Sequence, residues 1–438
     1  MIGTLTKLEN PFLNAFSRAE ELANQGPAWL RELRKRGLDA HQGLSVPSQK
    51  EEEWKYTSLR RMSQMELEAA EPGPAVFDQD LPTAGDGSIR VVLSNGRFDR
   101  NLSTVTTTPG LKVTSLYNAI IENEDFVSRY LGKIAPIADF TFAALNTSLF
   151  EDGVVVHVGK EASVASVIEI VHVTSGDGFV ASPRCLIVCE EGAKATIYES
   201  YLSDREGESV TLPVTEVFVA SGADVEHVRF QDESMKSHHI GLWQVHQAGD
   251  SEYRSYNVAF GAALGRVDQN IYLDGEGVTT RLDGVVIAKG TQVLDNHTRL
   301  DHACPNGNSF EIYKQIIDDE ATIVFNGKIF VHQDAQKTDA KQTNQALLLS
   351  PRATIDSKPQ LEIFADDVKC THGATVGQLE DTPMFYLRQR GIPEKEAEAL
   401  LVYAFAAEVL ELITDESIRD FLEAKLYEKL SGVPGRIS

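Results

Sequence analysis

Short strand-like runs fill the long stretch from Gly153 to about residue 370, and they constrain the fold more than any other feature. Runs of β-branched and apolar residues, such as 154–156, 168–171 and 185–188, each end at a turn of Gly, Asp or Ser residues. No convincing long helix interrupts them. The stretch therefore needs an architecture that manages its sheet edges, and a sandwich, a barrel, a propeller or a solenoid would each do so.

An internal repeat helps to choose among these architectures. The tripeptide Ala-Thr-Ile at 321–323 recurs at 353–355, and at the same offset along the chain Ile329 is matched by Leu361. Stacked coils produce such a repeat, because each coil places the same inward side chains in a parallel ladder. The other turn spacings are irregular. The repeat favours a parallel β-helix, with a propeller as the alternative.

The first 150 residues are predicted to form a helical and mixed region. Two helices are expected over residues 11–37, with a break at 26–27 and an end at Gly37. A further helix is expected over 51–62. The Pro- and Gly-containing stretch 71–87 is typical of a linker.

The C-terminal region is predicted to be a helical hairpin with an acidic outer face. Pro393 suits a first helical turn, Thr414 is the expected N-cap of the second helix, and Gly432 follows that helix. The apolar stripe of the first helix is Ala397, Leu400, Leu401, Ala404, Phe405, Val409 and Leu412. Such a hairpin serves either as a cap over the end of a solenoid, the interpretation favoured by pattern alone, or as a docking surface.

Charge and composition exclude several classes of partner. Lys and Arg number 41 and Asp and Glu number 65, so the net charge of −24 repels phosphate backbones and anionic lipid. No secretory signal and no apolar run long enough to span a bilayer is evident. Four cysteines in a chain of 438 residues argue against a disulfide framework. We therefore expect a cytoplasmic protein that binds neither nucleic acid nor membrane.

Several common catalytic motifs are absent. The sequence has no G-x-x-x-x-G-K-[ST], so it lacks the loop and lysine that hold nucleotide phosphates, and we do not expect an ATPase. H-E-x-x-H, G-x-S-x-G and C-x-x-C are absent as well. The histidines His238, His239, His297 and His302 are interpreted as surface or satisfied polar residues and are given no role.

The cysteines differ in what their spacing allows. Cys185 and Cys189 share a strand face but are separated by about 13 Å, too far for one metal ion, so buried apolar packing is the favoured interpretation. Cys370 and His372, two residues apart, point to the same side of an extended segment, about 7 Å apart at Cα. Thiolate and imidazole suit iron or an iron–sulfur cluster, although by spacing alone a buried cysteine beside a hydrogen-bonded histidine is the favoured interpretation.

Five stretches of the sequence carry motifs typical of one known family. They are Glu52–Thr57, 144–155, 342–350, Pro359–Gly377 and 385–392. Together they resemble the SufB/SufD family of the SUF iron–sulfur cluster assembly machinery. The Glu-Trp-Lys-Tyr-Thr motif at 53–57 is typical of the SufD branch. No residue matches the sulfur-accepting cysteine of the SufB branch, and Thr371 stands where serine is commoner.

The resemblance implies a fold and a set of partners. It implies a mainly β protein whose core, residues 151–378, is a right-handed parallel β-helix between an N-terminal helical and mixed region, 1–150, and a helical C-terminal domain, 379–438. Family members pair with the paralogue SufB and bind the ABC-type ATPase SufC through their C-terminal helices. ATP hydrolysis then belongs to SufC, and this chain is expected to be a scaffold and not an enzyme.

The resemblance also implies site residues. His372 matches the family's candidate ligand for a transient iron–sulfur cluster shared with SufB, and Cys370 lies in the same block. No tightly bound cofactor is expected in the isolated chain. The residues expected to contact SufC are Leu400, Leu401, Ala404, Phe405 and Glu408.

Two alternative functions remain at this point. Parallel β-helices also include polysaccharide lyases and hydrolases, which use carboxylates and basic residues in a groove along the coils. A scaffold that works as a homodimer, without a paralogue, is the other alternative.

Overall fold

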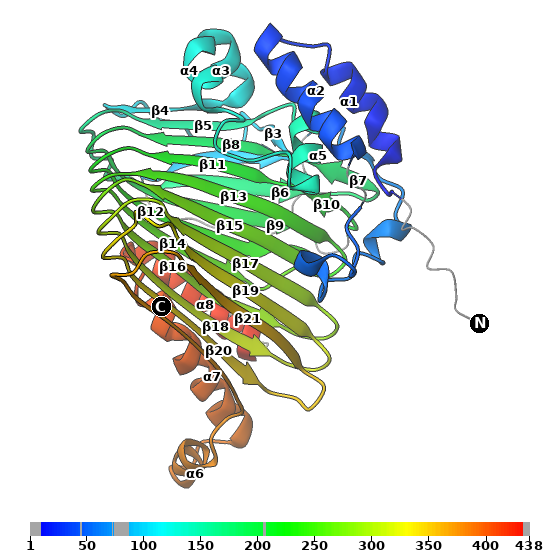
Figure 1. Ribbon diagram of the computed structural model, residues 1–438. Helices are drawn as coiled ribbons and strands as arrows, with labels where there is room; N and C mark the ends of the chain where they lie inside the picture. The colour runs from blue at the N-terminus through cyan, green and yellow to red at the C-terminus, as the bar shows by residue number, and fades with distance from the viewer. Residues whose placement is uncertain (1–9, 44–45, 72, 74–86, 205–206, 432–438) are drawn as a thin grey trace.

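The computed structural model describes residues 10–43, 46–71, 73, 87–204 and 207–431. Two large sheets face each other, and the chain passes from one to the other in successive coils (Figure 1). The main path of the first sheet, sheet A, is β21 (Thr354–Ile363), β19 (Thr322–Val331), β17 (Val293–His302), β15 (Leu264–Asp274), β13 (His238–Ala248), β11 (Val214–Val219), β8 (Arg184–Cys189), β5 (Gly153–Val158) and β4 (Leu111–Ser115). Three short strands lie beside that path, β1 (Glu68–Ala69), β7 (Phe179–Ala181) and β10 (Val210–Thr211).

The second sheet, sheet B, follows the same order of coils. Its path is β22 (Lys369–Gly377), β20 (Asp339–Leu348), β18 (Asn308–Ile317), β16 (Thr279–Ala288), β14 (Glu252–Ala259), β12 (Asp224–Asp232), β9 (Lys194–Ser203), β6 (Ile168–Thr174), β2 (Ile89–Ser94) and β3 (Arg97–Phe98). Within the described part of the chain, the strands that follow β5 pair with one another in parallel. The prediction of a parallel β-helix is confirmed.

The repeat seen in the sequence corresponds to one coil. Thr322 lies opposite Thr354 in the ladder of β19 and β21, and Ile329 lies opposite Leu361, so the register there is the one that the repeat predicts. Elsewhere the register changes, and His238 lies opposite Leu264, a shorter step along the chain. Coils of unequal length explain why most turn spacings looked irregular.

The interior of the β-helix is built from alternate residues of both sheets. Because successive side chains of a strand point to opposite faces, each strand contributes every second residue. The apolar part of the interior contains Val156, Ile170, Ile187, Ile197, Val217, Val225, Val245, Ile271, Leu282 and Ile329, all buried. The β-branched residues that define the sequence pattern therefore form the ladders of this core.

The N-terminal region packs over the first coils (Figure 1). Its helices are α1 (Phe16–Leu22), α2 (Ala28–Gly43), α3 (Leu116–Glu122), α4 (Glu124–Tyr130) and α5 (Thr141–Leu149), and three short 3-10 turns are η1 (Leu13–Ala15), η2 (Glu52–Trp54) and η3 (Met62–Gln64). Its strand β2 joins sheet B beside β6. Most of the predicted linker 71–87 lies outside the described residues.

Two helix predictions in this region are wrong. The second helix does not end at Gly37 but continues to Gly43. The glycine is needed for close packing and not for ending the helix, because a Cβ at this position would lie 2.8 Å from the carbonyl oxygen of Ala144 on α5. The stretch 51–62 forms no α-helix but the turn η2, further turns and the start of η3, and its side chains Glu53 and Thr57 bind to sheet A.

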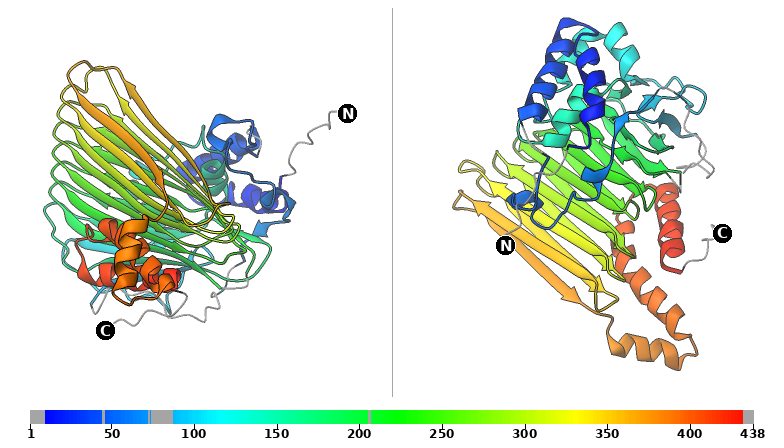
Figure 2. Two further views of the ribbon diagram at one scale, coloured as in Figure 1. Left: turned by 90° about the horizontal axis from the view of Figure 1, so that it is seen from below. Right: turned by 90° about the vertical axis from the view of Figure 1, so that its right-hand side faces the viewer.

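The C-terminal helices α6 (Asp381–Gln389), α7 (Glu394–Leu410) and α8 (Glu416–Ser431) lie along the outer face of sheet B and beyond the last coil (Figure 2). The hairpin of α7 and α8 is as predicted, but it packs against the side of the solenoid and leaves the last strands exposed, so the interpretation as an end cap is wrong. Thr414 is not the N-cap. Asp415 accepts the hydrogen bond from the amide of Ile418, and Thr414 bonds to Glu226 instead.

Candidate functional site

The last coil of the β-helix has an open edge. β21 and β22 stand first in the orders of their sheets, and each pairs with one described strand, β21 with β19 and β22 with β20. Every residue of β22 except Cys370 is exposed, and β21 is at most half-buried. The outer edge of each strand presents unpaired backbone groups, which is the arrangement that accepts a further strand.

Cys370 and His372 lie on β22, on the face that continues the interior of the solenoid. Cys370 lies opposite the buried Ala340 and packs half-buried against the core, whereas His372 lies opposite Gln342 and is exposed. Burial, reinforced by Asp339, raises the pKa of the Cys370 thiol. Both donors therefore share one face, and the imidazole is open to a neighbouring molecule.

A chain of buried hydrogen bonds lies beneath His372. Gln342 donates to Glu311 at 2.7 Å, and the Thr298 hydroxyl donates to the other oxygen of Glu311 at 2.6 Å. Burial raises the pKa of Glu311 to about 7. β20, the strand that pairs with β22, is therefore held in place by a polar network inside the coil.

The predicted SufC-binding residues differ in exposure. Leu400 is 41% exposed, Leu401 is half-buried and Ala404 is exposed. Phe405 and Glu408 contact Lys314 of β18: the ammonium lies 4.6 Å from the Phe405 ring centre and 2.5 Å from a Glu408 oxygen. The first three residues therefore form the free face of α7, and the other two help attach α7 to sheet B.

Helix α6 presents an apolar surface that helical periodicity had not singled out. Phe385 and Tyr386 are 63% and 58% exposed, and Arg390 donates to the hydroxyl of Tyr386. In Figure 1 α6 extends past the last coil, away from the solenoid. The signal in the sequence was the aromatic pair itself, which lies in one of the stretches that carried the resemblance.

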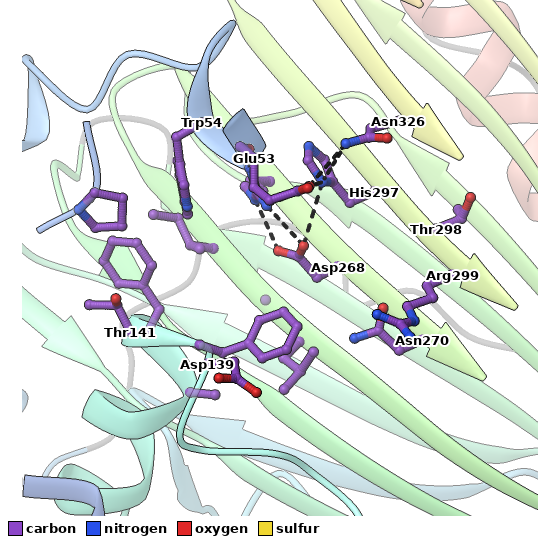
Figure 3. Close-up of a pocket in the computed structure, with 18 of the residues that line it drawn as sticks. Glu53, Trp54, Asp139, Thr141, Asp268, Asn270, His297, Thr298, Arg299 and Asn326 are labelled. Carbon is purple, nitrogen blue, oxygen red and sulfur yellow. Dashed lines mark hydrogen bonds and ion pairs between the residues drawn. The ribbon is translucent and has the colours of Figure 1, made fainter. Parts of the chain in front are cut away.

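A large pocket lies between the turn η2 and the outer face of sheet A (Figure 3). Its volume is about 490 Å³. Glu53 and Trp54 form one wall, and side chains of β15, β17 and β19 form the floor, including Asp268, His297 and Asn326. No sequence pattern had connected the motif at 53–57 with these strands.

The contacts in the pocket attach the N-terminal motif to the solenoid. The Arg266 guanidinium lies 3.9 Å from the centre of the Trp54 ring and is also held by Asp268 and Asp295. A carboxylate oxygen of Glu53 lies 3.3 Å from His297 and 3.0 Å from Asn326. We assign these residues a structural role.

The cationic residues of the pocket floor are already paired. Arg299 forms an ion pair with Asp301, and both residues lie on β17. Lys328 on β19 forms an ion pair with Glu362 on β21. Because these basic side chains are already paired with acidic neighbours, they do not indicate a particular ligand. We therefore assign no ligand to the pocket.

The fold and the open last coil define a parallel β-helix protein with helical ends and an exposed, donor-bearing edge strand. The family model described as "SUF system FeS cluster assembly, SufBD core domain" matches residues 172–405, and that of the "SufBD protein N-terminal region" matches residues 6–170. The chain belongs to the SufBD family and has its role in iron–sulfur cluster assembly.

The relatives agree with this assignment. The chain is 34% identical over 393 residues to the iron-sulfur cluster assembly protein SufD of Escherichia coli, covering 88% of this chain and 90% of that protein. It is 34% identical to a SufBD family protein of Synechocystis, covering 86% of each chain, and 25% identical to SufD of Bacillus subtilis, covering 98% and 99%. Within the described residues, none of the helices has the length and apolar character needed to cross a bilayer.

Proposed function

We propose that this chain is a non-catalytic scaffold subunit that pairs with the paralogue SufB along its last coil. The observation that carries the proposal is the open edge of β21 and β22 with His372 exposed on it. Unpaired edge strands invite association, so proteins cover them or use them as interfaces. A second β-helix that joined at this edge would satisfy the backbone groups and cover the exposed face of β22.

His372 is the proposed ligand of the nascent cluster, which is the cargo of the complex. Its imidazole and the Cys370 thiol are donors suited to iron and to iron–sulfur clusters. Two donors do not close a site, so SufB supplies the others across the interface. Cys370 is half-buried, with its thiol pKa raised, and is the weaker candidate.

The C-terminal helices are the proposed binding surface for SufC. Leu400, Leu401 and Ala404 present an apolar face that the hairpin does not use for its own packing. ATP hydrolysis takes place in SufC, since this sequence lacks a phosphate-binding loop.

We further propose that SufC transmits nucleotide binding to the interface. Movement of two SufC copies would act on α7, and α7 is fixed to β18 through Lys314, Phe405 and Glu408. A two-state element biased by a ligand is the physical basis for such coupling. The stiff ladders of sheet B connect β18 through β20 to β22.

Co-purification of the full-length chain from a native cell extract tests these proposals. We expect SufB and SufC among the captured chains, identified by mass spectrometry, and a complex larger than a dimer by size-exclusion chromatography. Recovery of this chain as a homodimer alone would contradict the pairing with SufB and would support the homodimeric scaffold. The family models describe cluster assembly, so we do not propose polysaccharide cleavage.

A further inference from the structure

A second cluster of metal-binding side chains lies deep inside the β-helix, far along the chain from β22. His172 on β6 and Glu199 on β9 point inward from sheet B, and Cys185 on β8 points inward from sheet A. All three residues are buried. A thiol, an imidazole and a carboxylate thus converge from different strands of neighbouring coils.

The donor atoms are spaced as ligands of one ion would be. The Nε2 of His172 lies 3.9 Å from the Cys185 sulfur and 3.1 Å from a Glu199 oxygen, and all the ligand atoms lie within 4.8 Å of one another. Tetrahedral coordination with ordinary Zn–N, Zn–O and Zn–S bond lengths separates such ligands by about 3.4 to 3.6 Å. Small side-chain shifts would therefore bring all three to bonding distance.

Charge balance favours a divalent cation at this position. The Glu199 carboxylate is contacted by the ring nitrogens of two buried histidines, His172 at 3.1 Å and His227 at 3.2 Å. A carboxylate and a thiolate together carry two negative charges. One divalent ion that displaced the thiol proton to solvent would leave thiolate, carboxylate and cation with no net charge.

The surrounding side chains fix the orientation of the donors. The Tyr201 hydroxyl and the Thr215 hydroxyl donate to one oxygen of Glu199, at 2.7 and 3.0 Å. The Tyr201 ring stacks on His172 with 4.2 Å between ring centres. The Nδ1 of His172 has no hydrogen-bond partner within the described chain, so the polar contacts of this buried ring come from the cluster.

We propose that His172, Cys185 and Glu199 bind one divalent cation of borderline softness, Zn²⁺ or Fe²⁺, inside the β-helix. Cysteine, histidine and carboxylate ligands together suit these ions better than Mg²⁺ or Ca²⁺, which prefer oxygen ligands alone. Three protein ligands leave a fourth position for water or for the Thr215 hydroxyl. This site is separate from β22, and it differs from the sequence-based expectation that the isolated chain holds no tightly bound group.

Cobalt replaces zinc and iron and reports thiolate ligation in its absorption spectrum. The full-length chain, freed of metal by unfolding with a chelator and a reductant, is refolded with Co²⁺, because the buried site needs an opening for entry. We expect one equivalent of bound Co²⁺ with a thiolate-to-cobalt charge-transfer band. Metal analysis of protein purified from native cells then distinguishes zinc from iron.

Matched variants assign the band to this site. Cys185→Ser should abolish the band, and Cys189→Ser should keep it, since Cys189 is an equally buried thiol further along the same strand. Circular dichroism checks that each variant folds, and Glu199→Gln, which keeps the thiol, should weaken Co²⁺ binding at least tenfold. A Cys370→Ser, His372→Ala double variant should keep the band, so this test is independent of the proposed function.

Three outcomes overturn the proposal. They are the absence of the band in refolded wild-type protein, its persistence in Cys185→Ser, and its equal loss in Cys189→Ser.

Discussion

The guanidinium carbon of Arg266 lies 3.9 Å from the centre of the Trp54 ring, although the two residues are far apart in the sequence. Arg266 is almost completely buried on β15 and also bonds to the backbone oxygen of Glu53. A buried cation stacked on an indole forms one of the stronger cation–π contacts. The N-terminal motif is therefore bound to the middle of the solenoid.

Replacement of Trp54 by Ala should destabilise the protein. The variant loses the contact with Arg266 and the packing against Phe142, so we expect the free energy of unfolding to fall by about 2 kcal/mol for this half-buried ring. Urea unfolding measures the change. The control is Tyr56→Ala in the same motif, where the ring is 38% exposed and a loss below about 1 kcal/mol is expected. Equal losses in the two variants would contradict the role of Trp54.

Stability should depend on the protonation of His297. Burial lowers the pKa of this ring, but Asp295 and Glu53 outweigh burial and raise the pKa to about 9. A group whose pKa is higher in the folded state stabilises the fold below its unfolded pKa, about 6.5, and this contribution is lost as the pH rises through about 9. The contribution is of order 3 kcal/mol, since the shift from about 6.5 to about 9 is about 2.5 units and each unit is worth about 1.4 kcal/mol.

His297→Gln tests this linkage. The difference in unfolding free energy between wild type and variant should be largest near pH 6 and should shrink by pH 10. The other titratable groups are the same in both proteins, so their contributions to the pH dependence cancel in this difference. His246→Gln, at a partly exposed histidine on β13, serves as the control. A difference that is constant with pH would show that His297 is not charged in the folded protein.

The close packing of α2 on α5 predicts the effect of a methyl group at Gly37. Alanine would improve helix propensity by about 1 kcal/mol, but its Cβ would lie 2.8 Å from the Ala144 carbonyl oxygen and 2.9 Å from the Thr147 side chain. We expect a net loss of about 1 to 3 kcal/mol, the usual cost of overpacking. Asp39→Ala, an exposed site on the same helix, should change stability by less than about 0.5 kcal/mol. A stabilised Gly37→Ala variant would contradict the packing argument.

The sequence predicted those features of the fold that depend on local pattern. The strand runs, the parallel coils and the register that places Thr322 opposite Thr354 follow from periodicity and repetition. The stretch 51–62 was mispredicted as a helix, because Glu53 and Thr57 bind to Asn326 and Asp295, which local propensity does not reveal.

The same contrast, between features set by local pattern and features set by contacts between distant segments, applies to the candidate sites. Cys370 and His372 were identified because they lie close together on one strand. The interior group of His172, Cys185 and Glu199 was missed, and Cys185 was interpreted as apolar packing. Its neighbours come from other strands, Glu199 from the next strand β9 and His172 from the preceding coil, at sequence spacings that match no ligand motif. Only the stacking of coils, with His172 opposite Tyr201, brings them together.

The free face of α7 predicts a variant that separates docking from folding. Leu400→Asp places a charge at a 41% exposed position, so stability should change by less than about 1 kcal/mol while SufC is lost from pull-downs. Ala406→Asp buries an unpaired charge at a fully buried position of the same helix and should unfold the hairpin, which circular dichroism detects. Normal SufC capture by folded Leu400→Asp would remove this face from the proposed binding surface.

The exposed position of His372 predicts that its removal affects assembly chemistry and leaves the fold intact. The side chain has no described contact that would stabilise β22, so His372→Ala should change the unfolding free energy by less than about 0.5 kcal/mol. The complex with SufB and SufC should still form by size-exclusion chromatography. Its yield of iron and sulfide after reconstitution should fall at least severalfold, because one ligand of the shared site is missing.

Thr371→Ala is the matched control for this prediction, since Thr371 is the exposed neighbour of His372 on the opposite face of β22. It should assemble clusters normally. Cys370→Ser then separates the two donors of the same face: a loss as large as that of His372→Ala would make the thiol a second ligand. Unchanged loading in His372→Ala, with the complex intact, would exclude the imidazole from the cluster site and leave the open edge as a purely structural interface.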